Sequence, residues 1–198
     1  MYKPEECAKR ARALPPATRE SVELLGRELE QLKALQGEAE LAMLRESHRH
    51  RIARILETAP GFGPVRVAQM LPIVVTPHRF RTKRQFWSYC GFAIVTRTSS
   101  DWVKGNRGWV RAPVVQTRGL NFNHHPMLKM LFKGAATTVI AQAAPNPLRA
   151  SYDRLLEQGT RPNLAKLTVA RNLAAIVLAM WKKEEPYDPR KIHEIATG

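Results

Sequence analysis

Residues 52–71 read IARILETAPGFGPVRVAQML, and the interpretation of the whole chain starts from this stretch. The spacing of its apolar residues predicts two amphipathic helices joined by a tight turn at Gly61-Phe62-Gly63. Glycine permits positive φ and close backbone approach, and Pro64 suits the first helical position, where its missing N–H would have no partner. The stretch is therefore predicted to be a helix-hairpin-helix.

This turn has two interpretations, and the stretch alone does not separate them. In the first, backbone N–H groups at the start of the second helix bind a nucleic-acid phosphate, helped by the positive end of the helix dipole. Gly61, Gly63 and Arg66 are then candidate nucleic-acid-binding residues. In the second, the turn only joins two packed core helices.

The distribution of charge favours the first interpretation. The chain has 198 residues and a net charge of +15. Residues 1–60 carry +1 and residues 136–198 carry +3, whereas residues 61–135 hold 12 basic side chains and one acid, Asp101, for a net +11. Such a basic segment indicates binding to a polyanion, and nucleic acid is the preferred partner. An anionic membrane surface is the weaker alternative, because glycine and proline interrupt the segment and leave no long amphipathic helix.

Composition and cysteine usage indicate a cytoplasmic protein. The chain is 44% hydrophobic, which is enough for a core. The N-terminus lacks the apolar segment of a signal peptide, and no run approaches the ~18 apolar residues of a membrane span. Cys7 and Cys90 are far apart and have no Cys-x-x-Cys partner, so neither a zinc site nor a disulfide framework is expected.

Residues 18–49 are predicted to form one long helix capped by Thr18. Its apolar or small residues alternate by three and four positions, with Gln36 as the one polar interruption: Val22, Leu25, Leu29, Leu32, Ala39 and Met43. This heptad pattern favours a self-associating coiled coil over a helix packed along its own domain. We therefore divide the chain into a coiled-coil dimerisation helix (1–50), a helix-hairpin-helix domain (51–189) and a tail (190–198).

The basic middle is densest around Arg81, Lys83 and Arg84. Thr82 and Gln85 have capping-box spacing and predict a short helix over 83–90. Its aromatic residues are expected in the core, with base stacking as the alternative. Residues 93–111 predict a basic β-hairpin that carries Arg97, Lys104 and Arg107, and Arg118 follows it. Further helices are expected from a cap at Asn123 and over 148–158 and 163–183, so the fold class is mainly α with one small β-hairpin.

The residues provide little support for metal chemistry in this chain. Metal-dependent cleavage of a phosphodiester needs several converging carboxylates, and the basic middle contains only Asp101. We therefore expect no metal site. A hydroxyl nucleophile is the remaining candidate, because Ser99 and Ser100 are flanked by cations that could stabilise negative charge on phosphate. A polar strand end explains the same two serines without chemistry.

Several motifs resemble, in their order, the C-terminal half of insertion-sequence-110 family transposases. They are Pro60-Gly-Phe-Gly-Pro, Phe86-Trp-Ser-Tyr-Cys-Gly-Phe-Ala, Thr96-Arg-Thr-Ser-Ser, Thr117-Arg-Gly-Leu-Asn, Asn146-Pro-Leu-Arg, Thr168-Val-Ala-Arg-Asn-Leu and Pro186-Tyr-Asp-Pro. The resemblance covers about residues 50–189, and the preceding heptad helix is similar to the coiled-coil linker of that family.

The resemblance implies a recombinase made of two halves. An N-terminal nuclease half supplies acidic residues and Mg²⁺, and the C-terminal half supplies a serine that becomes linked to DNA while a structured bridge RNA chooses the sites. The family serine falls on Ser99, with Ser100 as the adjacent alternative. The heptad helix lies within the first 50 residues here, so we expect a truncated or split product, or a nuclease half on a separate chain.

Three functional hypotheses follow. The first is the serine-bearing, nucleic-acid-binding portion of such a transposase, which associates with itself, DNA and guide RNA and is not competent alone. The second is a catalytically silent DNA- or RNA-binding module, either a remnant or a repressor. The third is a scaffold that only oligomerises through its heptads.

Overall fold

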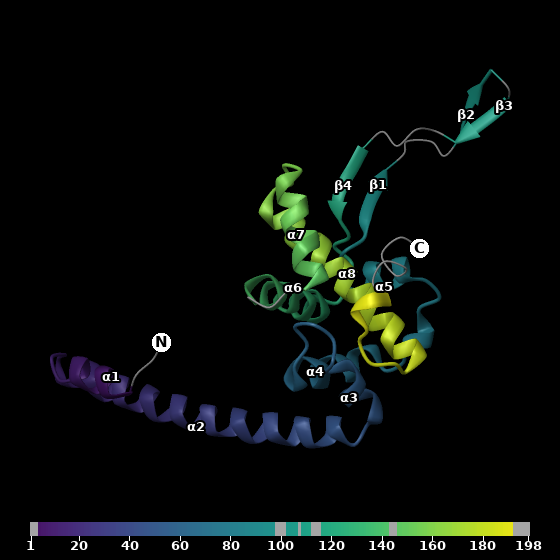
Figure 1. Ribbon diagram of the computed structural model, residues 1–198. Coiled ribbons are helices and arrows are strands. Elements are labelled where there is room, and N and C mark those ends of the chain that lie inside the picture. The colour runs from purple at the N-terminus through teal and green to yellow at the C-terminus, as the bar shows by residue number, and fades with distance from the viewer. Residues whose placement is uncertain (1–3, 98–101, 107, 112–115, 143–145, 192–198) are drawn as a thin grey trace. The chain divides into compact units, whose positions relative to one another are not determined.

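The computed structural model describes residues 4–97, 102–106, 108–111, 116–142 and 146–191 (Figure 1). The chain separates into two compact units, Met1–Glu46 and Ser47–Gly198.

Eight α-helices, two 3₁₀ turns and four short strands lie within the described residues. The helices are α1 Pro4–Ala11, α2 Pro16–His48, α3 Arg51–Leu56, α4 Pro64–Val74, α5 Lys83–Tyr89, α6 Pro126–Ala141, α7 Pro147–Glu157 and α8 Pro162–Lys183. The 3₁₀ turns are η1 Pro77–Arg79 and η2 Pro189–Lys191, and the strands are β1 Ile94–Arg97, β2 Trp102–Gly105, β3 Gly108–Arg111 and β4 Gln116–Leu120.

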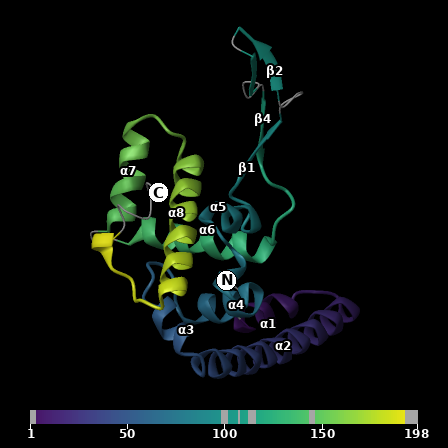
Figure 2. The same cartoon turned by 90° about the vertical axis from the view of Figure 1, so that its right-hand side faces the viewer.

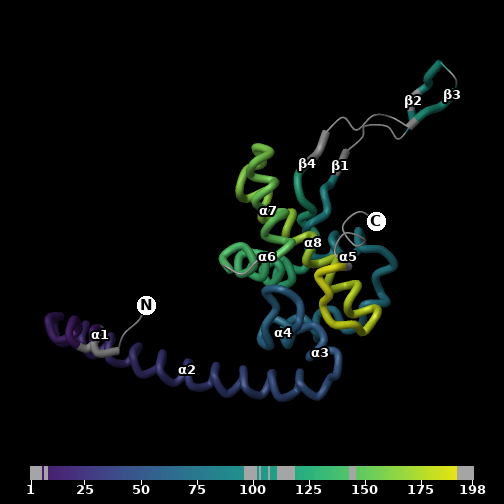
Figure 3. The backbone as a smooth tube through the Cα atoms, in the orientation of Figure 1, coloured from purple at the N-terminus to yellow at the C-terminus, as the bar shows by residue number. Residues whose placement is uncertain are grey.

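The first unit consists of α1 and most of α2. Figure 3 follows α2 as one uninterrupted helix of 33 residues, as the heptad pattern predicts. The link between the two helices is closed by Arg19, whose Nη2 donates to the carbonyls of Arg12 (2.9 Å) and Leu14 (3.2 Å). Two residues of the heptad seam, Leu25 and Leu32, are 61% and 63% exposed. These two seam residues are therefore largely exposed in the single chain.

The core of the second unit is built on α8. This helix contacts α3, α5, α6, α7 and η1, and eleven of its residues are buried. Figure 2 shows α7 lying beside α8 and α6 crossing it. Such a helix is apolar on most of its circumference because neighbours cover it on several sides.

Phe132 on α6 joins segments that lie far apart in the sequence. Its ring centroid lies 5.2 Å from Phe62 in the α3–α4 turn, 5.8 Å from Phe86 on α5 and 6.2 Å from Phe92 just before β1. All four rings are buried. Tilted and edge-to-face aromatic pairs at these separations are favourable beyond the area they bury. The cluster therefore fixes the turn, α5 and the start of β1 on α6.

The four strands form two antiparallel ladders along one hairpin of the chain. The outer pair, β2 and β3, runs in register from Trp102 opposite Arg111 to Gly105 opposite Gly108. The inner pair, β1 and β4, aligns Ile94 with Leu120 and is interrupted by a register shift before Thr96. The mainly α fold with a small hairpin is confirmed, and the sequence did not predict the β1–β4 ladder. We call the two ladders together the ribbon.

Two helix starts differ from their predictions. Helix α2 begins at Pro16, so Thr18 lies within its first turn and does not cap it. Helix α6 begins at Pro126, three residues after the expected cap at Asn123. The backbone N–H of Asn123 instead donates to Oδ1 of Asn121 at 3.0 Å, and residues 121–125 form a separate turn. Pro126 then occupies the first helical position, for which its fixed φ is suited.

The two glycines of the α3–α4 turn should respond differently to substitution. Gly61 has φ +72°, and a Cβ there would lie 2.5 Å from the carbonyl oxygen of Ala135. Gly61→Ala is therefore expected to lower the free energy of unfolding by about 2 kcal/mol or more. Gly63 has φ −101° and open space around it, so Gly63→Ala should cost less than about 1 kcal/mol. Urea denaturation of both variants checks this, and equal losses would contradict it.

Candidate nucleic-acid interface

The α3–α4 turn contains one packed glycine and one open glycine. Gly61 faces the backbone of α6, so its lack of a side chain is explained by packing. Its carbonyl accepts a 2.6 Å hydrogen bond from Nη1 of Arg66, and the guanidinium of Arg66 lies over Gly134. Both residues thus contribute to the contact between the turn and α6. Their role in binding nucleic acid stays a prediction.

The start of α4 retains the features expected of an anion site. Gly63 is the N-cap, and Pro64 follows at the first helical position. Apart from Gly63 and its two neighbours in the chain, no described atom lies within 4 Å of the point where a Cβ of Gly63 would be, so a ligand can approach the backbone there. Helix α4 has no acidic residue in its first turn that would compete for its N–H groups.

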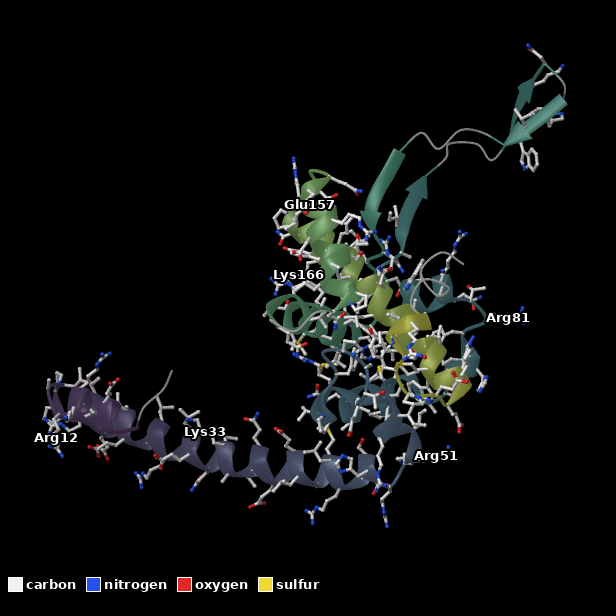
Figure 4. All side chains as sticks on the ribbon, in the orientation of Figure 1. Arg12, Lys33, Arg51, Arg81, Glu157 and Lys166 are labelled. Atoms are coloured by element: carbon white, nitrogen blue, oxygen red, sulfur yellow. The ribbon has the colours of Figure 1, made fainter. Side chains whose placement is uncertain are left out.

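The basic residues around α5 stand on a rigid turn. Thr82 caps α5 by accepting from the N–H of Gln85 (3.3 Å), and Oε1 of Gln85 accepts from the N–H of Arg81 (2.7 Å). The first bond is that of the predicted capping box, whereas the return bond from Gln85 goes to the residue before the cap, Arg81, and not to Thr82 itself. The side chains of Arg81 and Arg84 are exposed, and Figure 4 labels Arg81. Lys83 lies 5.6 Å from the centroid of the Trp87 ring.

The outer ladder of the ribbon displays two tryptophans beside a lysine. Trp102 and Lys104 lie on the same face of β2, and Lys104 is paired with Trp109 on β3. Trp102 is 60% exposed, Trp109 is 69% exposed, and Lys104 is also exposed. Exposed aromatic rings interleaved with cations suit stacking on nucleobases next to phosphates.

Several predicted residues lie outside what the structure describes. Ser99, Ser100 and Arg107 are not among the described residues. Arg97 and Arg118 are placed by their backbone only. Arg97 ends β1 opposite Gln116, and Arg118 is the middle residue of β4. The structure therefore brings the backbones of these two arginines to the inner ladder.

Arg171 of α8 anchors the start of β1 to the core. Its Nη2 donates to the carbonyl of Phe92 at 2.8 Å, and its guanidinium lies 5.6 Å from the Trp87 ring. In return, Nε1 of Trp87 donates to the carbonyl of Arg171 at 2.9 Å. Partial burial lowers the pKa of Arg171. This arginine belongs to one of the motifs noted above, and its contacts give it a structural role.

Sequence reasoning missed the two exposed tryptophans. The aromatic residues of α5, for which base stacking was the alternative, are core residues: Phe86 is buried, and Trp87 and Tyr89 are partly buried against the core. The signal for the tryptophans was present, since Trp102 and Trp109 flank a turn at positions that share one face of a hairpin.

The described residues do not fit a Mg²⁺ site. Within them, no three His, Cys, Asp or Glu side chains come together in a way that could hold a metal ion. The described thiol, that of Cys90, is free and buried, and burial raises its pKa well above the usual range. A thiol with a raised pKa is a poor nucleophile at neutral pH.

A comparison with protein families decides the assignment. The profile of the family described as Transposase IS116/IS110/IS902 matches residues 53–153. The chain belongs to this transposase family. Its role is therefore in transposition. No curated protein gives a significant match to the chain.

The family match begins within α3, ends within α7 and includes the whole ribbon. Two residues of the Asn146-Pro-Leu-Arg motif, near the end of the match, have structural roles. Asn146 caps α7 by accepting from the N–H of Leu148 at 2.9 Å. Arg149 donates to the carbonyls of Ile140 (2.7 Å) and Gln142 (2.8 Å) and so caps the end of α6.

One helix of the transposase, α8, is long and apolar enough to cross a membrane by length and composition alone. Most of its apolar window is buried inside the fold, as in the core helix of a globular domain.

Replacing Arg171 should loosen the attachment of the ribbon. Arg171→Met would leave the Phe92 carbonyl without its donor, and an unpaired carbonyl in such a site costs about 1–3 kcal/mol. Amide hydrogen exchange should therefore become faster at Ile94 and Asn121. The matched control is Arg154→Met on the exposed side of α7. Unchanged exchange in the Arg171 variant would show that other contacts hold the ribbon.

Proposed function

We propose that this chain is the nucleic-acid-binding, serine-bearing portion of a DNA transposase, with Ser99 as the nucleophile. The observation that carries the proposal is the family match, which contains the whole segment with net charge +11. The exposed Trp102, Lys104 and Trp109 on the ribbon add support, because aromatic rings and cations together suit nucleic acid.

The proposed chemistry is a transesterification. The Oγ atom of Ser99 attacks a DNA phosphorus, an Oγ–P bond forms, and a P–O bond to a deoxyribose oxygen breaks. The serine loses its hydroxyl proton and the leaving sugar oxygen gains one, so the step needs neither oxidant nor reductant. Surrounding cations would stabilise the charge that develops on the phosphoryl oxygens. Ser100 is the alternative nucleophile.

The chain is proposed to depend on other components. Among the described residues no three His, Cys, Asp or Glu side chains are grouped so that they could hold a metal ion, and Mg²⁺-dependent cleavage is therefore proposed to come from a separate acidic nuclease half. A structured guide RNA is the second proposed partner, and DNA is the substrate. No cofactor is proposed for this chain itself.

The direct test is formation of a covalent adduct. The chain is mixed with a nuclease half, guide RNA and donor and target DNA, and denaturing electrophoresis follows protein linked to labelled DNA. We expect an adduct that Ser99→Ala abolishes and Ser100→Ala retains. Nucleic-acid affinity should be the same in wild type and Ser99→Ala. An adduct of unchanged yield in the Ser99 variant would refute the assigned nucleophile.

A catalytically silent binding module is the second candidate. It is favoured by the same basic segment and the open helix start at Gly63, which would suffice for binding without chemistry. Absence of any adduct with the complete set of components, together with intact nucleic-acid binding, would establish this candidate in place of the first.

Self-association through α2 is part of the proposal. Leu25 and Leu32 are heptad residues that the single chain leaves exposed, and a parallel or antiparallel second copy of α2 would cover them. Leu24 and Leu35 are similarly exposed but lie off the seam.

Charged substitutions on the seam should dissociate the oligomer. Leu25→Lys with Leu32→Lys places two buried cations in the coiled coil, so sedimentation should change from oligomer to monomer. The control pair, Leu24→Lys with Leu35→Lys, carries the same added charge and should remain associated. A monomeric wild type at micromolar concentration, or the same shift in both pairs, would contradict the assignment of the seam.

A further inference from the structure

The start of α6 is flanked by two open pockets that share residues. The first, of about 650 Å³, lies between the η1–α5 region and the turn of residues 121–125. The second, of about 460 Å³, lies between α6 and α8. His124 and Pro126 line both pockets, so the two are parts of one surface. We call this surface the α6 groove.

The side chains of the α6 groove are those of an anion site. Lys129, Lys133 and Lys166 line the second pocket, and Lys166 projects from α8 (Figure 4). Arg79, His124 and His125 line the first. Among the described residues that line the two pockets there is no carboxylate. Helix α6 also has no acidic residue in its first turn, so the positive end of its dipole is not neutralised there.

Arg79 is positioned by two aromatic rings, and each of the two histidines has a ring nitrogen without a partner among the described residues. The Arg79 guanidinium lies 5.0 Å from the Tyr89 ring centroid and 5.2 Å from that of Phe80, which orients it over the rim of the first pocket. The Nδ1 atoms of His124 and His125 are buried and have no hydrogen-bond partner among the described residues. Buried polar atoms without a partner are uncommon in folded proteins, and here both lie in the turn that lines the first pocket.

The turn beside the first pocket presents an aromatic ring to solvent. Phe122 is 92% exposed, although it lies between Asn121 and Asn123, which both line the pocket. The backbone around it is fixed. The N–H of Asn121 donates to the Ala93 carbonyl (2.9 Å), and Nδ2 of Asn121 donates to the Asn123 carbonyl (2.7 Å).

Further bonds complete the turn. The N–H of His124 donates to the carbonyl of Phe122 at 3.1 Å, and that of His125 donates to the carbonyl of Tyr89 at 2.9 Å. Because the backbone of the turn is fixed, only the side-chain rotamers of Phe122 need to be ordered when a flat ligand stacks on its ring.

We infer that the α6 groove binds an unpaired nucleic-acid strand, with Phe122 stacking on a base and the flanking cations contacting phosphates. The inference rests on the proposed function, because it specifies the form of nucleic acid that the chain would bind. A basic groove combined with an aromatic platform is how proteins hold single strands, and a base is available for stacking only where it is unpaired. Each pocket is also of a size that takes a nucleotide-sized group.

The test uses the full chain and a fluorescent single-stranded oligonucleotide, with anisotropy measured at several salt concentrations. Phe122→Ala should weaken binding on the order of 10-fold, whereas Phe122→Trp should retain affinity. Because Phe122 is exposed, neither change should alter the urea midpoint. A blunt duplex of the same sequence should bind the wild type and Phe122→Ala equally well, since its bases are already stacked.

A charge-matched pair of double variants tests the binding of phosphates by the groove. Lys133→Gln with Lys166→Gln removes two groove lysines, and Arg154→Gln with Lys183→Gln removes two exposed cations that line neither pocket. The groove pair should lower the slope of log affinity against log salt by about 0.7 for each phosphate that is no longer neutralised. The control pair should change the slope much less.

The outcomes separate the groove from the proposed function. A wild-type chain that binds no nucleic acid at low salt would overturn the proposed function, and the groove with it. If the wild type and Phe122→Ala bind single strands with the same affinity, the assignment of strand binding to the α6 groove is overturned, and the proposed function stands. Equal loss of affinity for strand and duplex in Phe122→Ala would also overturn the assignment to an unpaired strand.

Discussion

The packing of four phenylalanine rings around Phe132 determines how this transposase presents its basic segment. The ring of Phe132 on α6 contacts three other rings. Phe62 lies in the α3–α4 turn, Phe86 lies on α5, and Phe92 lies two residues before β1. These are the segments that carry the basic residues. A helix-rich core thus holds a turn, a short helix and the foot of a ribbon in fixed positions, while Arg81, Arg84 and Lys104 remain exposed. Truncation of such a buried ring typically costs about 3–5 kcal/mol, so the positions of these three segments depend on this cluster.

Local features of the fold were predictable where the sequence itself carries the physical cause. The helices on either side of Gly61-Phe62-Gly63, the capping of α5 by Thr82 and the continuous α2 all follow from short-range patterns of apolar, capping and turn residues. Features that depend on distant neighbours were not predictable. Strand β4 reads Gln-Thr-Arg-Gly-Leu, which has no clear alternation, and it pairs only because β1 lies beside it. The start of α6 was misplaced because the side chain of Asn121 stabilises a separate turn before it.

The candidate site, too, has features that were predictable from the sequence and features that were not. The sequence located the basic segment, but it could not show that Gly61 faces the backbone of Ala135 while Gly63 stays open. From the sequence, packing and phosphate binding were alternative explanations for the whole turn. In the structure, packing against α6 explains the glycine at position 61, whereas Gly63 lies at an open helix start and remains the candidate for phosphate binding. Nor could the sequence show that Phe122 is exposed whereas Phe86, Phe92 and Phe132 are buried, because all four are ordinary core residues by type.

The central claim is that nucleic acid contacts the surface built on the Phe132 cluster, namely the ribbon and the start of α6. The most direct measurement is photocrosslinking of the chain to a nucleic-acid strand that carries photoreactive bases, with the linked peptides identified by mass spectrometry. Crosslinks should concentrate in residues 79–97, 102–111 and 121–134. Crosslinks confined to α2 and α7, with none in these three segments, would contradict the account.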